Sequence, residues 1–139
     1  MSEIPPPKIE AAMSLCAATA ARLVLNGHAD IANKLAAIDS LIKDGALSEA
    51  FEAYRNLPRF DVADFWESMD WMLNEHERTP VQEKALTAAY YNQTLKALGD
   101  LRVSALYGFQ RPLVDSSPAA VQQLALDYLS AVEARANGI

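Results

Sequence analysis

Apolar residues recur three or four positions apart along most of this chain, and glycine, proline or a capping side chain interrupts the pattern at intervals. In the first run the apolar side chains are Ile9, Met13, Cys16, Ala20 and Leu23. This spacing places them on one face of a helix. Because a helix buries such a stripe only against another element, the pattern predicts an all-α fold of packed helices.

The interruptions predict where each helix begins and ends. The clearest start is Thr79-Pro80-Val81-Gln82, in which a capping threonine, a first-turn proline and a glutamine form a capping box. Residues 1–7 are expected to form an extended, proline-rich lead, and residues 1–139 a single helical domain with short connections. The compact bundle would contain about six helices, near residues 8–25, 31–43, 48–57, 61–78, 80–107 and 118–136.

Gly99 leaves two interpretations open for the fifth of these helices. The helical period continues through Leu98, Leu101 and Ala105, which favours one long helix to about Tyr107 with a weak point or kink at Gly99. Two helices that meet at Gly99-Asp100 are the alternative. The alternation of apolar and polar side chains in residues 101–109 also permits a short strand.

Composition and charge restrict the class of protein. The chain has a formal net charge of −6 and one cysteine, so it forms no internal disulfide, which fits a reducing, cytoplasmic compartment. Basic residues are scattered, whereas a nucleic-acid binder needs them clustered. No apolar run is long enough to span a bilayer, and the first residues do not resemble a secretory signal. We therefore expect neither nucleic acid nor membrane as a partner.

The expected helix at residues 61–78 carries two tryptophans that point in different directions. Trp66 and Trp71 are five residues apart, which is a rotation of about 140° around a helix. Trp66 lies on the broad apolar stripe of this helix and is expected in the core. Trp71 falls almost opposite, among acidic residues that all lie off the stripe.

A large aromatic side chain within a ring of carboxylates has the anatomy of a protein-binding surface. The tryptophan would anchor a partner, and the carboxylates would attract a basic surface. The alternative is that Trp71 packs beneath a neighbouring helix or loop and that the acidic face is simply solvated. The candidate partner-binding residues are Trp71, Asp64, Glu67, Asp70, Asn74 and Glu75.

A second group of candidates lies on and after the fifth helix. Tyr90 and Tyr91 are adjacent, so at least one of them is expected to point away from the core centre. Interfaces favour tyrosine and arginine. The secondary partner-binding candidates are Tyr91, Tyr107, Phe109 and Arg111, although loop aromatics also fold back onto a bundle as a lid.

The sequence offers little from which to build a catalytic or metal site. Its two histidines, His28 and His76, belong to no pair with metal-ligand spacing, and Cys16 stands on an apolar stripe, where a buried and inert thiol is expected. No glycine-rich phosphate loop or nucleophile motif occurs. We expect a protein that is not an enzyme and needs no cofactor or metal.

These features favour a small acidic protein-binding module. Its most concrete form is an inhibitor or neutraliser of another protein, of the toxin-immunity, antitoxin or phage anti-defence type, which acts by steric and charge-complementary binding. The first alternative is a self-associating structural or adaptor subunit, with homo-oligomers. The second is an enzyme or small-ligand binder with a pocket inside the bundle, lined by His76 and the tyrosines.

Overall fold

The computed structural model describes residues 6–25, 28–57, 81–108 and 111–136. These residues form helices and connecting segments and contain no strand, so the predicted all-α fold is confirmed. Five helices lie within the described residues, where about six were expected, and the expected helix at 61–78 falls outside them. The helices are α1 (Pro6–Leu25), α2 (Ala29–Lys43), α3 (Leu47–Arg55), α5 (Val81–Tyr107) and α6 (Pro118–Ala136).

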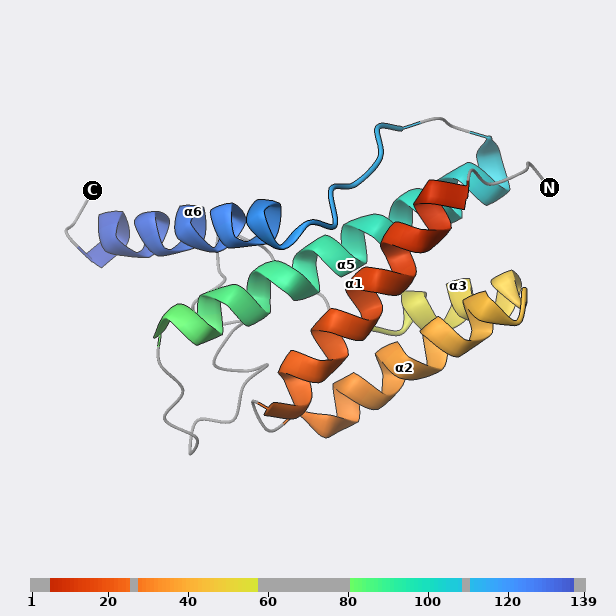
Figure 1. Cartoon of the computed structure of the whole chain (residues 1–139), viewed down its shortest axis with the longest axis horizontal. Coiled ribbons are helices and arrows are strands. Elements are labelled where there is room, and N and C mark those ends of the chain that lie inside the picture. The colour runs from red at the N-terminus through yellow and green to blue at the C-terminus, as the bar shows by residue number, and fades with distance from the viewer. Residues whose placement is uncertain (1–5, 26–27, 58–80, 109–110, 137–139) are drawn as a thin grey trace.

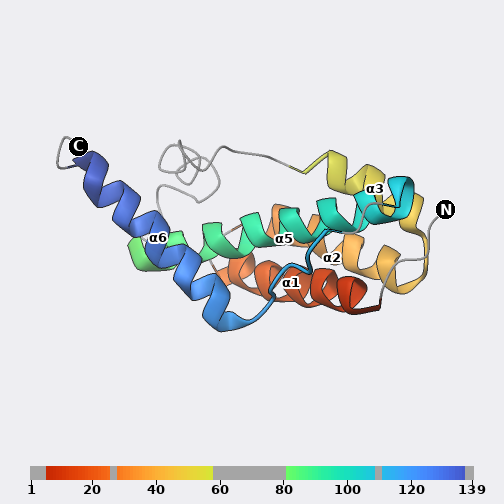
Figure 2. The ribbon, with the colours of Figure 1, turned by 90° about the horizontal axis from the view of Figure 1, so that it is seen from above.

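The helices are arranged around α1 and α5. α1 packs against α2 on one side and α5 on the other, and α3 contacts both α2 and α5. α6 packs mainly against α5 and runs back along it in the opposite direction (Figure 1). Seen from above, α1, α2 and α5 lie roughly along the same axis, whereas α6 crosses α5 obliquely (Figure 2). α5 therefore has neighbours on several sides.

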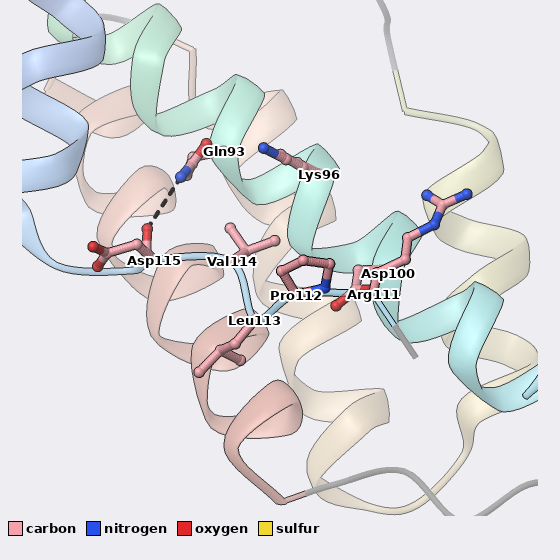
Figure 3. Close-up of a pocket in the computed structure, with 8 residues that line it drawn as sticks. All are labelled: Gln93, Lys96, Asp100, Arg111, Pro112, Leu113, Val114 and Asp115. Atoms are coloured by element: carbon pink, nitrogen blue, oxygen red, sulfur yellow. Dashed lines mark hydrogen bonds between the residues drawn. The ribbon is translucent and has the colours of Figure 1, made fainter. Parts of the chain in front are cut away.

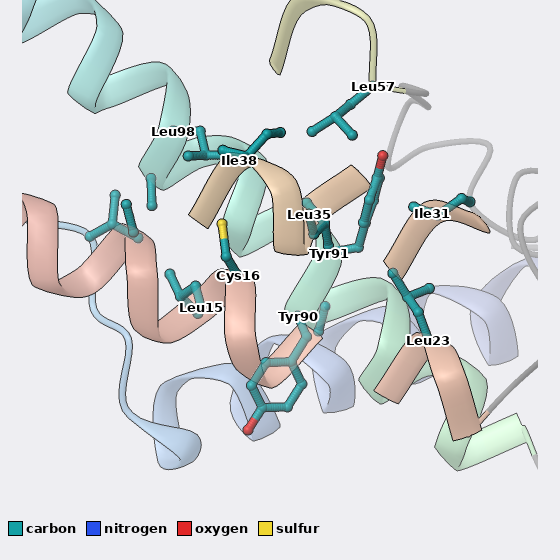
Figure 4. Packing of buried hydrophobic residues seen from close by; sticks show 14 of the residues in the cluster. Leu15, Cys16, Leu23, Ile31, Leu35, Ile38, Leu57, Tyr90, Tyr91 and Leu98 are labelled. Atoms are coloured by element: carbon teal, nitrogen blue, oxygen red, sulfur yellow. The ribbon is translucent and has the colours of Figure 1, made fainter. Parts of the chain in front are cut away.

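The hydrophobic core lies where α1, α2 and α5 meet. Leu15 and Leu23 of α1, Leu35 and Ile38 of α2, and Leu98 of α5 are almost completely buried there (Figure 4). Full burial of each large aliphatic side chain contributes about 1.5–3 kcal/mol to folding. The predicted stripe of α1 faces this core, with Cys16 and Leu23 fully buried and the other members half-buried.

Small side chains let α1 and α5 approach closely, and two threonines bridge their contact. The hydroxyls of Thr19 and Thr94 are 2.8 Å apart, and both residues are fully buried. The Thr94 hydroxyl also lies 2.8 Å from the Tyr90 carbonyl oxygen, four residues back on α5. Since each hydroxyl has one proton, the consistent arrangement is that Thr19 donates to Thr94 and Thr94 donates to Tyr90.

The helix ends agree with the predicted breakers in some places and differ in others. α1 begins at Pro6, so Pro6 and Pro7 lie in its first turn, and the expected extended lead to residue 7 is wrong there. Proline is tolerated in this turn because its missing N–H would have no partner. Gly45, at a φ of 74°, follows α2. Ser117 caps α6 by accepting a 3.3 Å hydrogen bond from the backbone N–H of Ala120.

α5 is one continuous helix of 27 residues, which confirms the long-helix interpretation and rules out the strand considered for residues 101–107. Gly99 serves a close helix contact within it. A Cβ at this position would lie 2.9 Å from the hydroxyl oxygen of Tyr54 on α3, so the absent side chain makes room for that tyrosine. The last residue of the helix is Tyr107. Gly108 follows it with a φ of 70°, a conformation that favours glycine.

The contact between α5 and α6 also contains a hydrogen bond. The side-chain amide of Asn92 donates to the Tyr128 hydroxyl over 2.8 Å. Burial raises the pKa of Tyr128, although the bond from Asn92 partly opposes that effect. Within the part of the chain that is described, no helix combines the length and apolar character needed to cross a membrane.

Candidate functional site

The best-defined polar feature of the structure is a buried ammonium group. Lys8 lies in the first turns of α1, and its Nζ is 3.0 Å from Oδ2 of Asp100 and 3.1 Å from Oδ1. It also donates to the Ser104 hydroxyl at 3.2 Å and to the backbone carbonyl of Arg111 at 2.9 Å. The Lys8 and Asp100 side chains are only 7% and 6% exposed. All three ammonium protons therefore have partners, as a buried charge requires.

The bond to Arg111 fixes one end of the segment that connects α5 to α6. Residues 111–117 contain no helix, and their other end is attached to α5 by a 3.1 Å hydrogen bond from the Gln93 amide to the Asp115 carbonyl. Val114, between these two attachments, is buried. The segment is thus attached to α1 at one end and to α5 at the other, and it buries Val114 between them.

A cavity of about 400 Å³ lies between this segment and α5 (Figure 3). One wall comes from successive turns of α5 and the other from the extended segment. Figure 3 shows Gln93 and Asp115 at one end, Val114 and Pro112 along the segment, and Arg111 at the opposite end. The lining residues are Gln93, Lys96, Asp100, Arg111, Pro112, Leu113, Val114 and Asp115.

The charges around this cavity are not balanced. The charge of Asp100 is compensated by the buried Lys8 ammonium. Lys96 and Arg111 are exposed cations, and Asp115 is the remaining anion of the lining. Hydrogen bonds from the backbone N–H and the hydroxyl of Ser117 lower the pKa of Asp115, so this carboxylate is ionised near neutral pH. Because the charge of Asp100 is already neutralised by Lys8, which lies outside the lining, one more positive than negative charge remains without this compensation.

The residues that the sequence singled out for partner binding divide into two groups. Those around Trp71 and also Phe109 lie outside the described residues. Tyr107 and Arg111 are described, and both are exposed at the surface. Arg111 also lines the cavity. Its backbone carbonyl oxygen accepts the hydrogen bond from the Lys8 ammonium. The candidates around Trp71 that lie outside the described residues are Trp71, Asp64, Glu67, Asp70, Asn74 and Glu75.

The two adjacent tyrosines point in different directions, but neither of them reaches the surface (Figure 4). Tyr91 is completely buried, and Tyr90 is buried as well. Figure 4 shows Tyr91 on the side of Leu35 and Ile31 and Tyr90 pointing in another direction. Both are covered because α5 has neighbours on more than one side, so a residue that turns away from one helix meets another. Tyr91 is therefore not a surface residue.

The chemically reactive side chains that are described have structural roles. Cys16 is fully buried, and burial, reinforced by the nearby Asp39 carboxylate, raises the pKa of its thiol to about 12. Its thiolate, the reactive form, is therefore scarce at neutral pH. His28 precedes α2 without capping it, and His76 is outside the described residues. Among the described residues, no group of three His, Cys, Asp or Glu side chains could bind a metal ion.

Apart from Arg111, none of the residues that form this site was among those singled out from the sequence. A local signal existed only for Lys8, since it stands three and four residues before Ala11 and Ala12 and seven before Leu15, on the buried face of α1. Gln93 and Lys96 become important only because a segment about twenty residues further along the chain returns to α5. Comparisons of the chain with protein-family models, with curated proteins and with solved structures give no match.

Proposed function

We propose that this protein acts by binding another protein, as an inhibitor or neutraliser that blocks its partner through shape and charge. The observation that carries the proposal is exposed apolar surface next to fixed backbone. Tyr107 at the end of α5 is 60% exposed, and Leu113 in the following segment is 53% exposed. Arg111, between them in sequence, is attached to the buried Lys8 through its carbonyl.

Fixed backbone matters because binding costs less when the contacting groups are ordered beforehand. Aromatic side chains and arginine are also the residue types that most often anchor an interface. Arg111 combines these two properties, and the exposed side chains of Tyr107 and Leu113 add apolar surface. They would supply a hydrophobic contact with a cationic group beside it.

The second support comes from the sequence of residues 61–78. There Trp71 is expected among the carboxylates of Asp64, Glu67, Asp70 and Glu75. Such a face would attract a partner with a basic surface, because opposite potentials accelerate encounter and fix orientation. The proposal includes a cytoplasmic location, since a single cysteine provides no internal disulfide.

Self-association is the second candidate, and one observation favours it. A shallow, mostly apolar groove runs between α5 and α6, and its lining includes Leu86, Ala125 and Leu129. Leu126 of α6 also lines it and is largely exposed. A second copy of the chain could cover this groove symmetrically. An assembly of this kind would bury α6 on its outer side.

A capture experiment with matched variants tests the primary proposal. The tagged protein is incubated with extract of its native host, and captured proteins are identified and then re-tested as purified components. We expect Trp71→Ala and Glu67→Lys to lose the purified partner. The control is Glu49→Lys, which makes the same charge change on the exposed surface of α3 and should retain the partner.

One outcome would count against the proposed role of the acidic face, and another against self-association. Equal binding by wild type, Trp71→Ala and Glu67→Lys, all correctly folded, would remove the acidic face from the interaction. Light scattering during size-exclusion chromatography measures the oligomeric state and so tests self-association, the second candidate. A strict monomer at high concentration contradicts self-association, whereas a dimer that Leu126→Glu dissociates supports it.

A further inference from the structure

We propose that the cavity between α5 and residues 111–115 is a second binding site, which takes a small amphipathic carboxylate. Such a ligand has an apolar body and one negatively charged end. This inference goes beyond the proposed protein binding and does not depend on it. It follows from the size of the cavity, its charge and the way its walls are held in place.

The size and lining suit a small molecule. A volume of about 400 Å³ lies within the range of known small-ligand pockets, which are mostly apolar with a few polar groups. Here Pro112, Leu113 and Val114 supply apolar surface along one wall. Figure 3 shows Val114 and Pro112 between the polar residues at the two ends. An apolar body would rest on this middle part.

The charge of the lining determines which end group is favoured. Asp100 is already neutralised by Lys8, so it does not repel an anion as an unpaired carboxylate would. Lys96 extends from α5 above Val114 in Figure 3, and its ammonium has no ion pair among the described residues. A carboxylate near Lys96 therefore meets an uncompensated cation.

The net charge of −6 for the whole chain does not cancel this local preference. Exposed charges more than about 8–10 Å apart are largely screened at physiological salt, whereas a carboxylate in the cavity would contact Lys96 directly. Asp115 is the nearest competing anion in the lining, and it lies at the Gln93 end of the cavity (Figure 3). The ligand carboxylate is therefore expected at Lys96 on α5, and not at Asp115 on the opposite wall.

The cavity is also ordered before any ligand arrives. The segment that forms its outer wall is attached through the Arg111 carbonyl to Lys8 and through the Asp115 carbonyl to Gln93. Val114 is buried between these attachments. The wall is therefore fixed at both ends by hydrogen bonds. A ligand therefore does not have to order the site, which favours binding.

The experiment is a titration of the isotopically labelled protein with octanoate, followed through backbone amide signals in NMR spectra. The uncharged analogue octanamide is the matched ligand. We expect saturable shifts at Gln93, Lys96, Val114 and Asp115 with octanoate at millimolar concentrations, and much weaker binding of octanamide. Lys96→Gln should weaken octanoate binding about fivefold, the amount that an exposed ion pair contributes.

Lys34→Gln is the control variant, because it removes an exposed charge of the same kind from α2, away from the cavity. It should bind octanoate as the wild type does. Equal affinity for octanoate and octanamide, or equal weakening by Lys34→Gln and Lys96→Gln, would overturn the assignment of the charged end. Shifts confined to other helices, or no saturable shift, would overturn the site itself. None of these outcomes bears on capture of a protein partner.

Discussion

Two ion pairs join α1 to α5, and they lie in very different surroundings. Near the start of α1, Lys8 and Asp100 are almost completely buried, at 7% and 6% exposure. Near its end, Arg22 and Glu83 form a 2.7 Å pair whose side chains are 28% and 37% exposed. Arg22 also lies 4.8 Å above the ring of Tyr90.

The difference shows that the distance between the charged atoms does not by itself measure what an ion pair contributes to the free energy of unfolding. The Arg22–Glu83 pair is the shorter, but water already solvates both of its members, so little is lost when one is removed. Removal of Lys8 would leave Asp100 charged and without solvent, which costs far more than the pair itself is worth. Burial, then, decides which of the two pairs the fold depends on.

The largest effect is expected for Lys8→Met. This substitution keeps the aliphatic stem but leaves the Asp100 carboxylate buried and unpaired, which should reduce the free energy of unfolding by about 3–5 kcal/mol. Urea denaturation followed by circular dichroism measures the change. The double variant Lys8→Met/Asp100→Leu should recover much of the loss, since neither charge remains. A double variant as unstable as the single one would contradict this account of the buried pair.

The hydrogen bond between the Thr19 and Thr94 hydroxyls joins the same two helices without any charge, so it sharpens the comparison. Thr94→Val keeps the shape but leaves the buried Thr19 hydroxyl without its acceptor, and we expect a loss of about 1–2 kcal/mol. Thr19→Val/Thr94→Val should cost less than the sum of the two single substitutions. Strict additivity in urea denaturation would indicate that the two hydroxyls do not interact.

Cys16, on the buried face of α1, tests burial of an ionisable group that has no ionic partner. Burial raises the pKa of its thiol from 9.0 to about 12. Between these values the unfolded chain releases a proton that the folded chain retains, so stability should fall as pH rises. At pH 10 the loss would be about 1.4 kcal/mol relative to Cys16→Ala. Identical alkaline pH profiles for wild type and Cys16→Ala would show that the thiol does not contribute.

The smallest effect is expected for Glu83→Gln. It removes the charge from the exposed pair but keeps the size of the side chain, so the loss should be about 0.5 kcal/mol and should shrink at high salt. The same urea experiment at two salt concentrations measures it. A loss as large as that of Lys8→Met would remove the contrast between the two pairs.

The helices were largely predictable because their signals are local. The stripe that includes Cys16 and Leu23 repeats within a few residues, and Ser117-Pro118 marks the start of α6 in the same way. The continuity of α5 through Gly99 was likewise predicted from the period of its apolar residues. Patterns of this kind report on the few residues nearest to them.

The cavity was not predictable, because it depends on contacts between distant residues. Lys8 is 92 positions from Asp100 and 103 from Arg111, and no spacing rule links them. Tyr91 was misjudged for a related reason: a helical wheel gives the direction of a side chain but not the number of neighbours around the helix. Arg111 was singled out by residue type as a partner-binding candidate, but its attachment through the backbone was not foreseen.

The position of Lys8 has a consequence for how the chain is made. The ribosome produces this lysine well before its partners Asp100, Ser104 and Arg111, which lie 92, 96 and 103 positions further along the chain. Contacts so distant along the chain form slowly and late. A nascent or truncated chain that ends before residue 100 has a cationic first helix without its counterion. Translation through Arg111 is therefore a condition for closing this end of the fold.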